Sequence, residues 1–183
     1  MQRRATISTL PDYLAPGLDV IFVGINPGMH SAKVGHYFAT PTNRFWPALN
    51  GSGLLTAPLD AGTDDQAIRQ GIGFTDVVKR PSNSASKLRA ADYRRWAPIL
   101  KEKLERSRPL IVCFHGVTAY RNYLKYAEGV DERPRLGLQD MTIGPSRVFV
   151  VPNPSPANAT YSLDDIVRWY RRLKGLRDGL KRK

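Results

Sequence analysis

The chain has 183 residues, 42% of them hydrophobic, which is long enough for one domain with its own core. It carries 28 Lys and Arg against 16 Asp and Glu, and this net charge of +12 favours a polyanionic partner, nucleic acid first. A single cysteine, Cys113, excludes an internal disulfide and a cysteine-only zinc or iron–sulfur site.

Targeting and membrane segments are not expected. No apolar run approaches the ~20 residues that a membrane span needs, and nothing resembles a signal peptide. The three histidines are too scattered to suggest a metal cluster. We therefore expect a cytoplasmic protein that uses no metal; we also expect a monomer.

The first third of the chain predicts a buried strand followed by a long ordered loop. Residues 1–10 are basic and polar and are expected to form a loose arm. Residues 18–23 are a short apolar run closed by Gly24, which is typical of a central strand. Residues 29–53 are rich in Gly, Pro, Thr and Asn, with a helical turn expected at 43–49. Long loops in compact domains are usually functional.

The middle of the chain predicts alternating helices and strands. Residues 64–70 suggest a short helix, and residues 73–78 suggest a strand or turn. Asp92 is well placed as the N-cap of an amphipathic helix that ends near residue 106. Residues 109–114 are a second buried strand, followed by a further helix.

The last third predicts a hairpin and a terminal helix. Residues 141–143 and 147–151 form the hairpin, Ser162 or Asp164 begins the helix, and residues 175–183 are a basic tail. Strands that alternate with helices favour a single α/β domain. The expected architecture is an α/β sandwich with a parallel-centred sheet and an open edge.

Two loops that follow apolar strands carry the side chains of a candidate site. Gly24-Ile25-Asn26-Pro27-Gly28 follows the first strand, and residues 153–158 follow the last. Ligands of open α/β sheets bind beyond the carboxyl ends of the strands. A third loop, at residues 37–46, supplies aromatic rings. An amide, exposed backbone N–H groups and a ring are the parts needed to hold an extruded base.

These motifs, in this order, resemble the mismatch-specific uracil-DNA glycosylases, close relatives of the thymine-DNA glycosylases. The matching segments are Gly-Ile-Asn-Pro-Gly at 24–28, Tyr-Phe-Ala-x-Pro-x-Asn-Arg-Phe-Trp at 37–46 and Asn-Pro-Ser at 153–155. The resemblance extends over residues 14–173 and implies a uracil-glycosylase-like three-layer αβα sandwich that uses no metal or cofactor. It also implies monofunctional hydrolysis of the N-glycosidic bond of uracil in DNA, notably opposite guanine, in base excision repair.

The same resemblance implies roles for individual residues. Asn26 positions the attacking water and Phe38 stacks on the flipped base, while the backbones of Ile25 and Phe38 contact its edge. Ser31 disfavours the 5-methyl group of thymine. Residues 153–159 match the loop that fills the gap left by the base. In that loop we assign Asn153 and Ser155 to the substrate and Pro156, Ala157 and Asn158 to DNA.

The loop at residues 153–159 departs from the family pattern. Family members often carry a bulky aliphatic wedge and an arginine there, where this chain has Ala157 and Ala159. Neither alanine can plug the gap or read the opposite guanine through a long side chain. Strict mismatch specificity is therefore not expected, and single-stranded uracil or uracil opposite adenine becomes a further substrate.

The site as described so far lacks a general base, because the neutral amide of Asn26 can orient water but cannot accept a proton near neutral pH. Asp92 and Asp76 are the candidate bases. We favour Asp92 because its segment is the most basic in the chain, although a helix cap explains it equally simply. Asp76 is expected to be structural.

A basic run between residues 79 and 108 holds ten Lys and Arg against three acidic residues. We assign Lys79, Arg80, Arg94 and Arg95 to DNA phosphates; the alternative is a solvated helix face. Two further functions stay open. One is a damaged-base sensor that binds and flips without cutting. The other is a nucleotide- or RNA-modifying enzyme, disfavoured because no phosphate-cradling Gly-rich loop is present.

Overall fold

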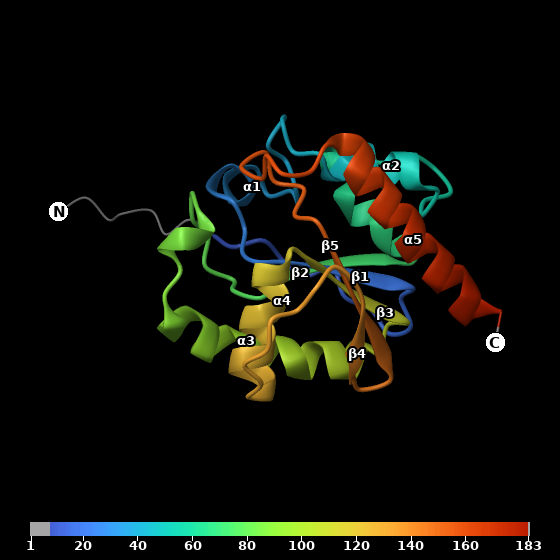
Figure 1. Ribbon diagram of the computed structural model, residues 1–183. Helices are drawn as coiled ribbons and strands as arrows, with labels where there is room; N and C mark the ends of the chain where they lie inside the picture. The colour runs from blue at the N-terminus through green and yellow to red at the C-terminus, as the bar shows by residue number, and fades with distance from the viewer. Residues whose placement is uncertain (1–7, 183) are drawn as a thin grey trace.

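The centre of the fold is a five-stranded sheet with helices on both faces (Figure 1). This computed structural model describes residues 8–182. The strands are β1 (Val20–Gly24), β2 (Ile72–Asp76), β3 (Ile111–His115), β4 (Gly137–Ile143) and β5 (Ser146–Val151). Their order is β2-β1-β3-β5-β4, and only β4 runs antiparallel to its neighbour. The predicted α/β sandwich with a parallel-centred sheet is confirmed.

The parallel strands are mostly apolar because both of their faces are covered. In β1, Val20 and Phe22 face one core cluster, whereas Ile21 and Val23 face the other. The first cluster lies under α2 (Phe45–Ser52) and α5 (Leu163–Lys181), and the second under α3 (Ala90–Ser107) and α4 (Val117–Tyr123). Two hydrophobic layers therefore hold the carboxyl ends of the strands in fixed positions.

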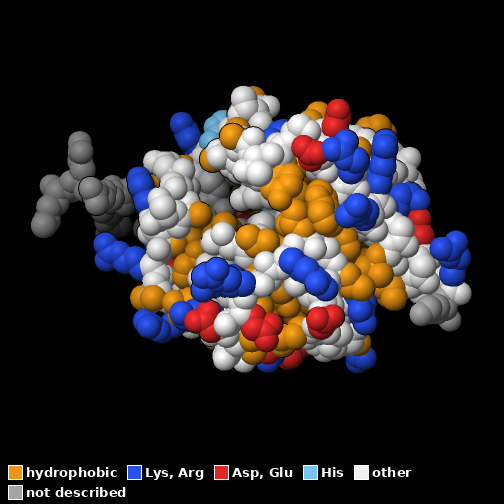
Figure 2. Space-filling view, viewed as in Figure 1, with side chains coloured by type: hydrophobic (Ala, Val, Ile, Leu, Met, Phe, Trp, Pro, Cys, Tyr) orange, Lys and Arg blue, Asp and Glu red, His pale blue; other side chains and the backbone are white. Residues whose placement is uncertain are grey.

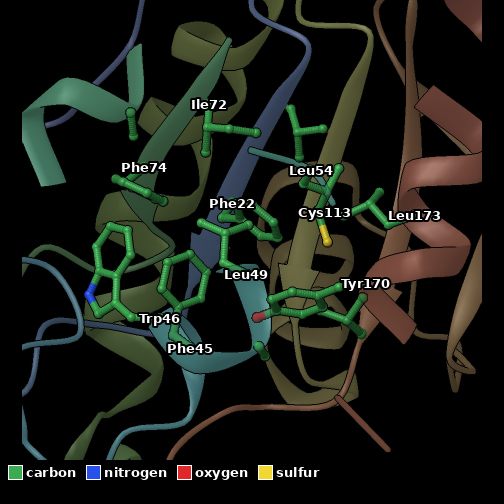
Figure 3. Packing of buried hydrophobic residues seen from close by; sticks show 14 of the residues in the cluster. Phe22, Phe45, Trp46, Leu49, Leu54, Ile72, Phe74, Cys113, Tyr170 and Leu173 are labelled. Atoms are coloured by element: carbon green, nitrogen blue, oxygen red, sulfur yellow. The ribbon is translucent and has the colours of Figure 1, made fainter. Parts of the chain in front are cut away.

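The first cluster is strongly aromatic. Figure 3 shows Phe22, Phe45 and Phe74 gathered between the sheet and α2, with Tyr170 reaching in from α5. Phe22 makes an edge contact with Phe45 at a ring-centroid distance of 5.3 Å. Cys113 is fully buried in the same cluster, in keeping with the small core residue expected in a strand.

The long loop expected at residues 29–53 contains more structure than its composition indicated. It folds into α1 (Met29–Val34) and α2, connected by an irregular segment. Gly and Pro lower intrinsic helix propensity, but burial against α5 outweighs propensity here. Three short elements complete the fold: η1 (Ala61–Gln70), η2 (Ala85–Lys87) and η3 (Leu124–Glu128).

The predicted arm and tail differ from expectation where they are described. Residues 1–7 of the expected arm lie outside the described residues, but Leu10 is only 2% exposed and belongs to the core. The predicted basic tail is helical, because α5 continues to Lys181, whose ammonium contacts Asp19. Within residues 8–182, no helix has the length and apolar character needed to cross a membrane.

Candidate active site

A cavity of about 760 Å³ opens where the four parallel strands end. Its wall includes Gly24 from β1, Asp76 from β2, His115 from β3 and Pro152 after β5. This is the edge of the sheet at which the sequence placed a ligand site. The cavity also brings together Ile25, Asn26, Ser31, Phe38, Asn153, Ser155, Pro156, Ala157 and Asn158. Asp92, Lys79, Arg80, Arg94 and Arg95 are not among its lining residues.

The amide of Asn26 is held from one side. Its Nδ2 donates hydrogen bonds to the backbone oxygen of Arg80 at 2.9 Å and to Ser82 Oγ at 2.8 Å, with a longer contact to Pro27 O at 3.2 Å. No hydrogen bond from residues 8–182 reaches the Oδ1 atom of Asn26. The side chain therefore presents a fixed acceptor to a ligand.

Ser82 is a site residue that the sequence interpretation missed. Its backbone N–H donates to Pro27 O at 3.1 Å, and its hydroxyl donates to Ser84 O while accepting from Asn26. The segment after β2 thus locks the Gly24–Gly28 turn in place. The only sequence signal for this contact was the Arg80-Pro81 dipeptide directly after the strand.

The ring of Phe38 is stacked on Phe45, with centroids 3.8 Å apart and planes inclined by 23°. Phe38 has a φ of 54°, an uncommon left-handed conformation for a bulky residue. Two flanking hydrogen bonds hold it there: Tyr37 N donates to Asp64 at 2.7 Å, and Ala39 N donates to Ser31 Oγ at 3.1 Å. The half-buried ring is thus a fixed platform in the cavity wall. Ser31 lines the cavity and also anchors this platform.

Asp76 was expected to be structural, yet it lies in the cavity wall and is only 6% exposed. Its Oδ1 lies 2.6 Å from where a Cβ on Gly24 would be, so this close approach requires glycine. Its Oδ2 is enclosed without a hydrogen bond, 3.6 Å from Lys79 Nζ. Burial raises the pKa of Asp76 to about 6, with the Lys79 ammonium opposing the shift and Asp12 adding to it.

Asp92 serves α3 rather than the cavity. Both of its carboxylate oxygens bind the Arg80 guanidinium, at 2.9 and 2.8 Å, and Oδ2 also accepts from Arg89 N. The hydrogen bonds from Arg80 lower the pKa of Asp92 to about 2. It stands at the third position of α3, from which it accepts the backbone N–H of the N-cap residue Arg89, and is not itself the N-cap. This geometry does not support the catalytic role that we expected for Asp92.

We expect Asp92→Asn to leave the chemical step unchanged. The substitution weakens a partly exposed ion pair, so it should lower the free energy of unfolding by roughly 0.5–1 kcal/mol. The single-turnover rate on a uracil-containing oligonucleotide should stay within threefold of wild type. A single-turnover rate that is lower by 100-fold or more in a folded variant would indicate that Asp92 takes part in catalysis.

Lys79 is buried rather than available to phosphate. Its Nζ lies 2.8 Å from Asp12 Oδ1 and 3.3 Å from Tyr37 OH, and the side chain is 7% exposed. Asp12 also accepts from Lys103 at 2.6 Å and from Thr75 at 2.7 Å. The expected DNA contact of Lys79 is therefore corrected, because its charge is neutralised beneath the cavity.

The other assigned cations lie outside the cavity. Arg80 is engaged by Asp92 and by Lys87 O, while Arg94 and Arg95 lie over the rings of Tyr126 and Trp96. On the face shown in Figure 2, Lys and Arg side chains are scattered over the centre and both sides, several of them beside acidic groups. They do not form one continuous basic patch on that face.

The loop at residues 153–158 is organised by its own side chains. Asn153 Oδ1 accepts from Ser155 N at 2.9 Å, and Ser155 Oγ accepts from Ala157 N at 3.3 Å. Asn158 Nδ2 donates back to Asn153 O at 2.9 Å. Pro156 and Ala157 are exposed at the tip. The tip is therefore rigid in its backbone and small in its side chains.

His115 completes the buried wall. Its ring stacks on Phe22, and its Nε2 lies 2.9 Å from Tyr170 OH. Burial lowers the pKa of His115 to about 3, so the imidazole is neutral near pH 7. Across residues 8–182, no three His, Cys, Asp or Glu side chains are grouped as metal ligands.

The chain is similar to known proteins in sequence and in fold. Residues 11–174 match the family model of the uracil DNA glycosylase superfamily. The fold is also similar to the solution NMR structure of a protein from Methanosarcina acetivorans that is provisionally described as a uracil DNA glycosylase. The TM-score is 0.58 at 21% sequence identity, over 92% of this chain and 98% of that chain.

Proposed function

The chain belongs to the uracil DNA glycosylase superfamily, and we propose that it is a monofunctional glycosylase that hydrolyses the N-glycosidic bond of uracil in DNA. One observation carries the proposal. The fixed amide of Asn26, the ring of Phe38 and the carboxylate of Asp76 all face one cavity at the carboxyl end of the sheet. These groups are suited to orient water, to hold a planar base and to accept a proton.

In the proposed reaction, the flipped base stacks on Phe38 and a water molecule donates a hydrogen bond to Asn26 Oδ1. The bond between C1′ of the sugar and N1 of uracil breaks, and its electron pair remains on the base. The water oxygen forms the new bond to C1′, and the released proton passes to Asp76. A base at this position is typically worth 10²–10⁴-fold in rate. Asp76 thus takes the role that we first assigned to Asp92.

Substrate choice follows from the small tip of the 153–158 loop. Ala157 and Ala159 offer no side chain long enough to contact a guanine across the duplex. We therefore propose that uracil opposite guanine, uracil opposite adenine and uracil in single strands are all cleaved. We also propose that the chain belongs to the mismatch-specific branch of the superfamily, and the motifs at residues 24–28 and 37–46 support this assignment.

A panel of oligonucleotides tests the proposal. The protein is incubated with uracil opposite guanine, uracil opposite adenine and uracil in a single strand, and abasic sites are then cleaved with alkali. We expect strand scission in all three after alkali and none before it. Binding without scission would favour the damaged-base sensor, and scission without alkali would indicate lyase chemistry.

The stacking platform has its own expected effect. Phe38→Ala should weaken retention of the flipped base by about 1–3 kcal/mol, the usual worth of a base stacked on an aromatic ring. The expected result is a lower rate at subsaturating enzyme. Tyr126→Ala is the matched control, because it removes a half-buried ring that packs on Tyr93 and does not line the cavity. Equal rates for the two variants would contradict the assignment of Phe38.

A further inference from the structure

The guanidinium of Arg44 binds the backbone of the loop that borders the cavity. It donates to four carbonyl oxygens of that loop: Pro154 at 3.4 Å, Ser155 at 2.6 Å, Asn158 at 2.6 Å and Tyr161. The backbone N–H of Arg44 also donates to Pro154 O at 3.2 Å. Among residues 8–182, no carboxylate forms an ion pair with Arg44. All four hydrogen bonds that this side chain makes within the described residues are thus directed at one loop.

Arginine is suited to this position because its planar guanidinium presents five donors in a fixed arrangement. Hydrogen bonds from a charged donor are roughly twice as strong as neutral ones. Lysine would keep the charge, but it could not bridge four carbonyls that point at one centre. The loop has no helix or strand of its own between β5 and α5, so its shape depends on these contacts.

Arg44 also connects the loop to the base platform. It occupies the N-cap position of α2, and the next residue is Phe45, on which the Phe38 ring stacks. One turn of the chain therefore positions both the platform and the loop. Phe45 acts through its ring and Arg44 through its guanidinium, so the two functions can be separated by mutation.

We propose that Arg44 is a positioning residue that holds residues 154–161 in the shape in which the loop enters duplex DNA. The proposal rests on the glycosylase function proposed above. Because Pro156 and Ala157 provide no bulky wedge, the loop must fill space in the duplex with its backbone, and that requires a rigid backbone. A single strand has no base stack to fill, so catalysis there does not need the clamp.

The test compares Arg44→Lys and Arg44→Gln with wild type on uracil opposite guanine and on the same uracil strand alone. We expect the single-turnover rate on duplex to fall at least tenfold and the rate on the single strand to stay within threefold. Arg171→Lys is the matched control, since this exposed arginine makes one contact to a carbonyl, Gly51 O. An equal loss on both substrates, or no loss on duplex, would overturn the proposal.

Amide hydrogen exchange of the free protein gives a readout that is independent of activity. We expect exchange at residues 155–160 to accelerate in Arg44→Lys and not in Arg171→Lys. If exchange at residues 155–160 is unchanged in Arg44→Lys, the clamp is overturned even if the protein cleaves uracil. If exchange there is faster but the wild type cleaves none of the substrates, only the proposed function is refuted. If the Arg44 variants fail to fold, hydrogen exchange of the wild type tests the proposal: the amides of Ala157 and Asn158, which are hydrogen-bonded within the loop, should exchange slowly, and rapid exchange there would overturn it.

Discussion

Replacing Asn26 with alanine is expected to lower the single-turnover rate of uracil release by about 10²-fold or more, because the water is no longer held in line with C1′. Affinity for DNA should change little, since the amide bonds to its own loops and, in the proposed reaction, to water rather than to phosphate. Asn122→Ala is a suitable control, because that exposed amide bonds only to Thr118 O in its own helix. A wild-type rate in Asn26→Ala would remove Asn26 from the mechanism.

The second large effect is expected for Asp76→Asn. The substitution keeps the size of the side chain but removes the proton acceptor, so the rate near pH 8 should fall by about 10²–10⁴-fold. In the wild type only the ionised carboxylate is active. With a pKa of about 6, the rate should therefore fall as the pH drops below 6 and level off above 7. The pH profile of Asp76→Asn should be flat over that range.

The buried carboxylate of Asp76, when ionised, should also lower the free energy of unfolding. Its pKa is raised from the ordinary value near 3.9, so the folded state binds a proton more tightly than the unfolded state does. Between about pH 4 and 6 the free energy of unfolding should thus decrease as the pH rises, and Asp76→Asn should be more stable than wild type at pH 8. Asp92→Asn is the control, because the pKa of Asp92 is shifted in the opposite direction.

Two outcomes would contradict the role of Asp76. One is a rate for Asp76→Asn within threefold of wild type at pH 8. The other is a wild-type acid limb that persists unchanged in the variant, which would assign the titration to another group. Higher stability combined with lost activity is the result that only a functional buried carboxylate explains.

The turn around Asn26 could be predicted because its position depends on local sequence. An apolar run that ends in Gly-Ile-Asn-Pro-Gly leaves the amide at the carboxyl end of a strand wherever that strand lies in the sheet. The ring of Phe38 was assigned from the resemblance of residues 37–46 to a family motif. The position of Asn26 thus needed only residues that are neighbours in the chain, whereas the assignment of Phe38 needed the family pattern.

The roles of Asp76, Asp92 and Lys79 could not be read in this way, because each depends on a partner distant in sequence. Asp76 reaches the cavity because β2 pairs with β1 and because Gly24 leaves room for its carboxylate. Lys79 is buried because Asp12, from the segment before β1, neutralises it. Arg80 occupies both oxygens of Asp92. The distribution of charges along the sequence does not predict which distant residues form these pairs.

Product analysis of a single-turnover reaction tests the central claim most directly. Enzyme in excess is mixed at pH 8 with duplex DNA that carries uracil opposite guanine, and free base and strand length are measured over time. We predict one equivalent of free uracil per duplex, with the strand intact until alkali is added. Bound duplex that retains all of its uracil would contradict the claim.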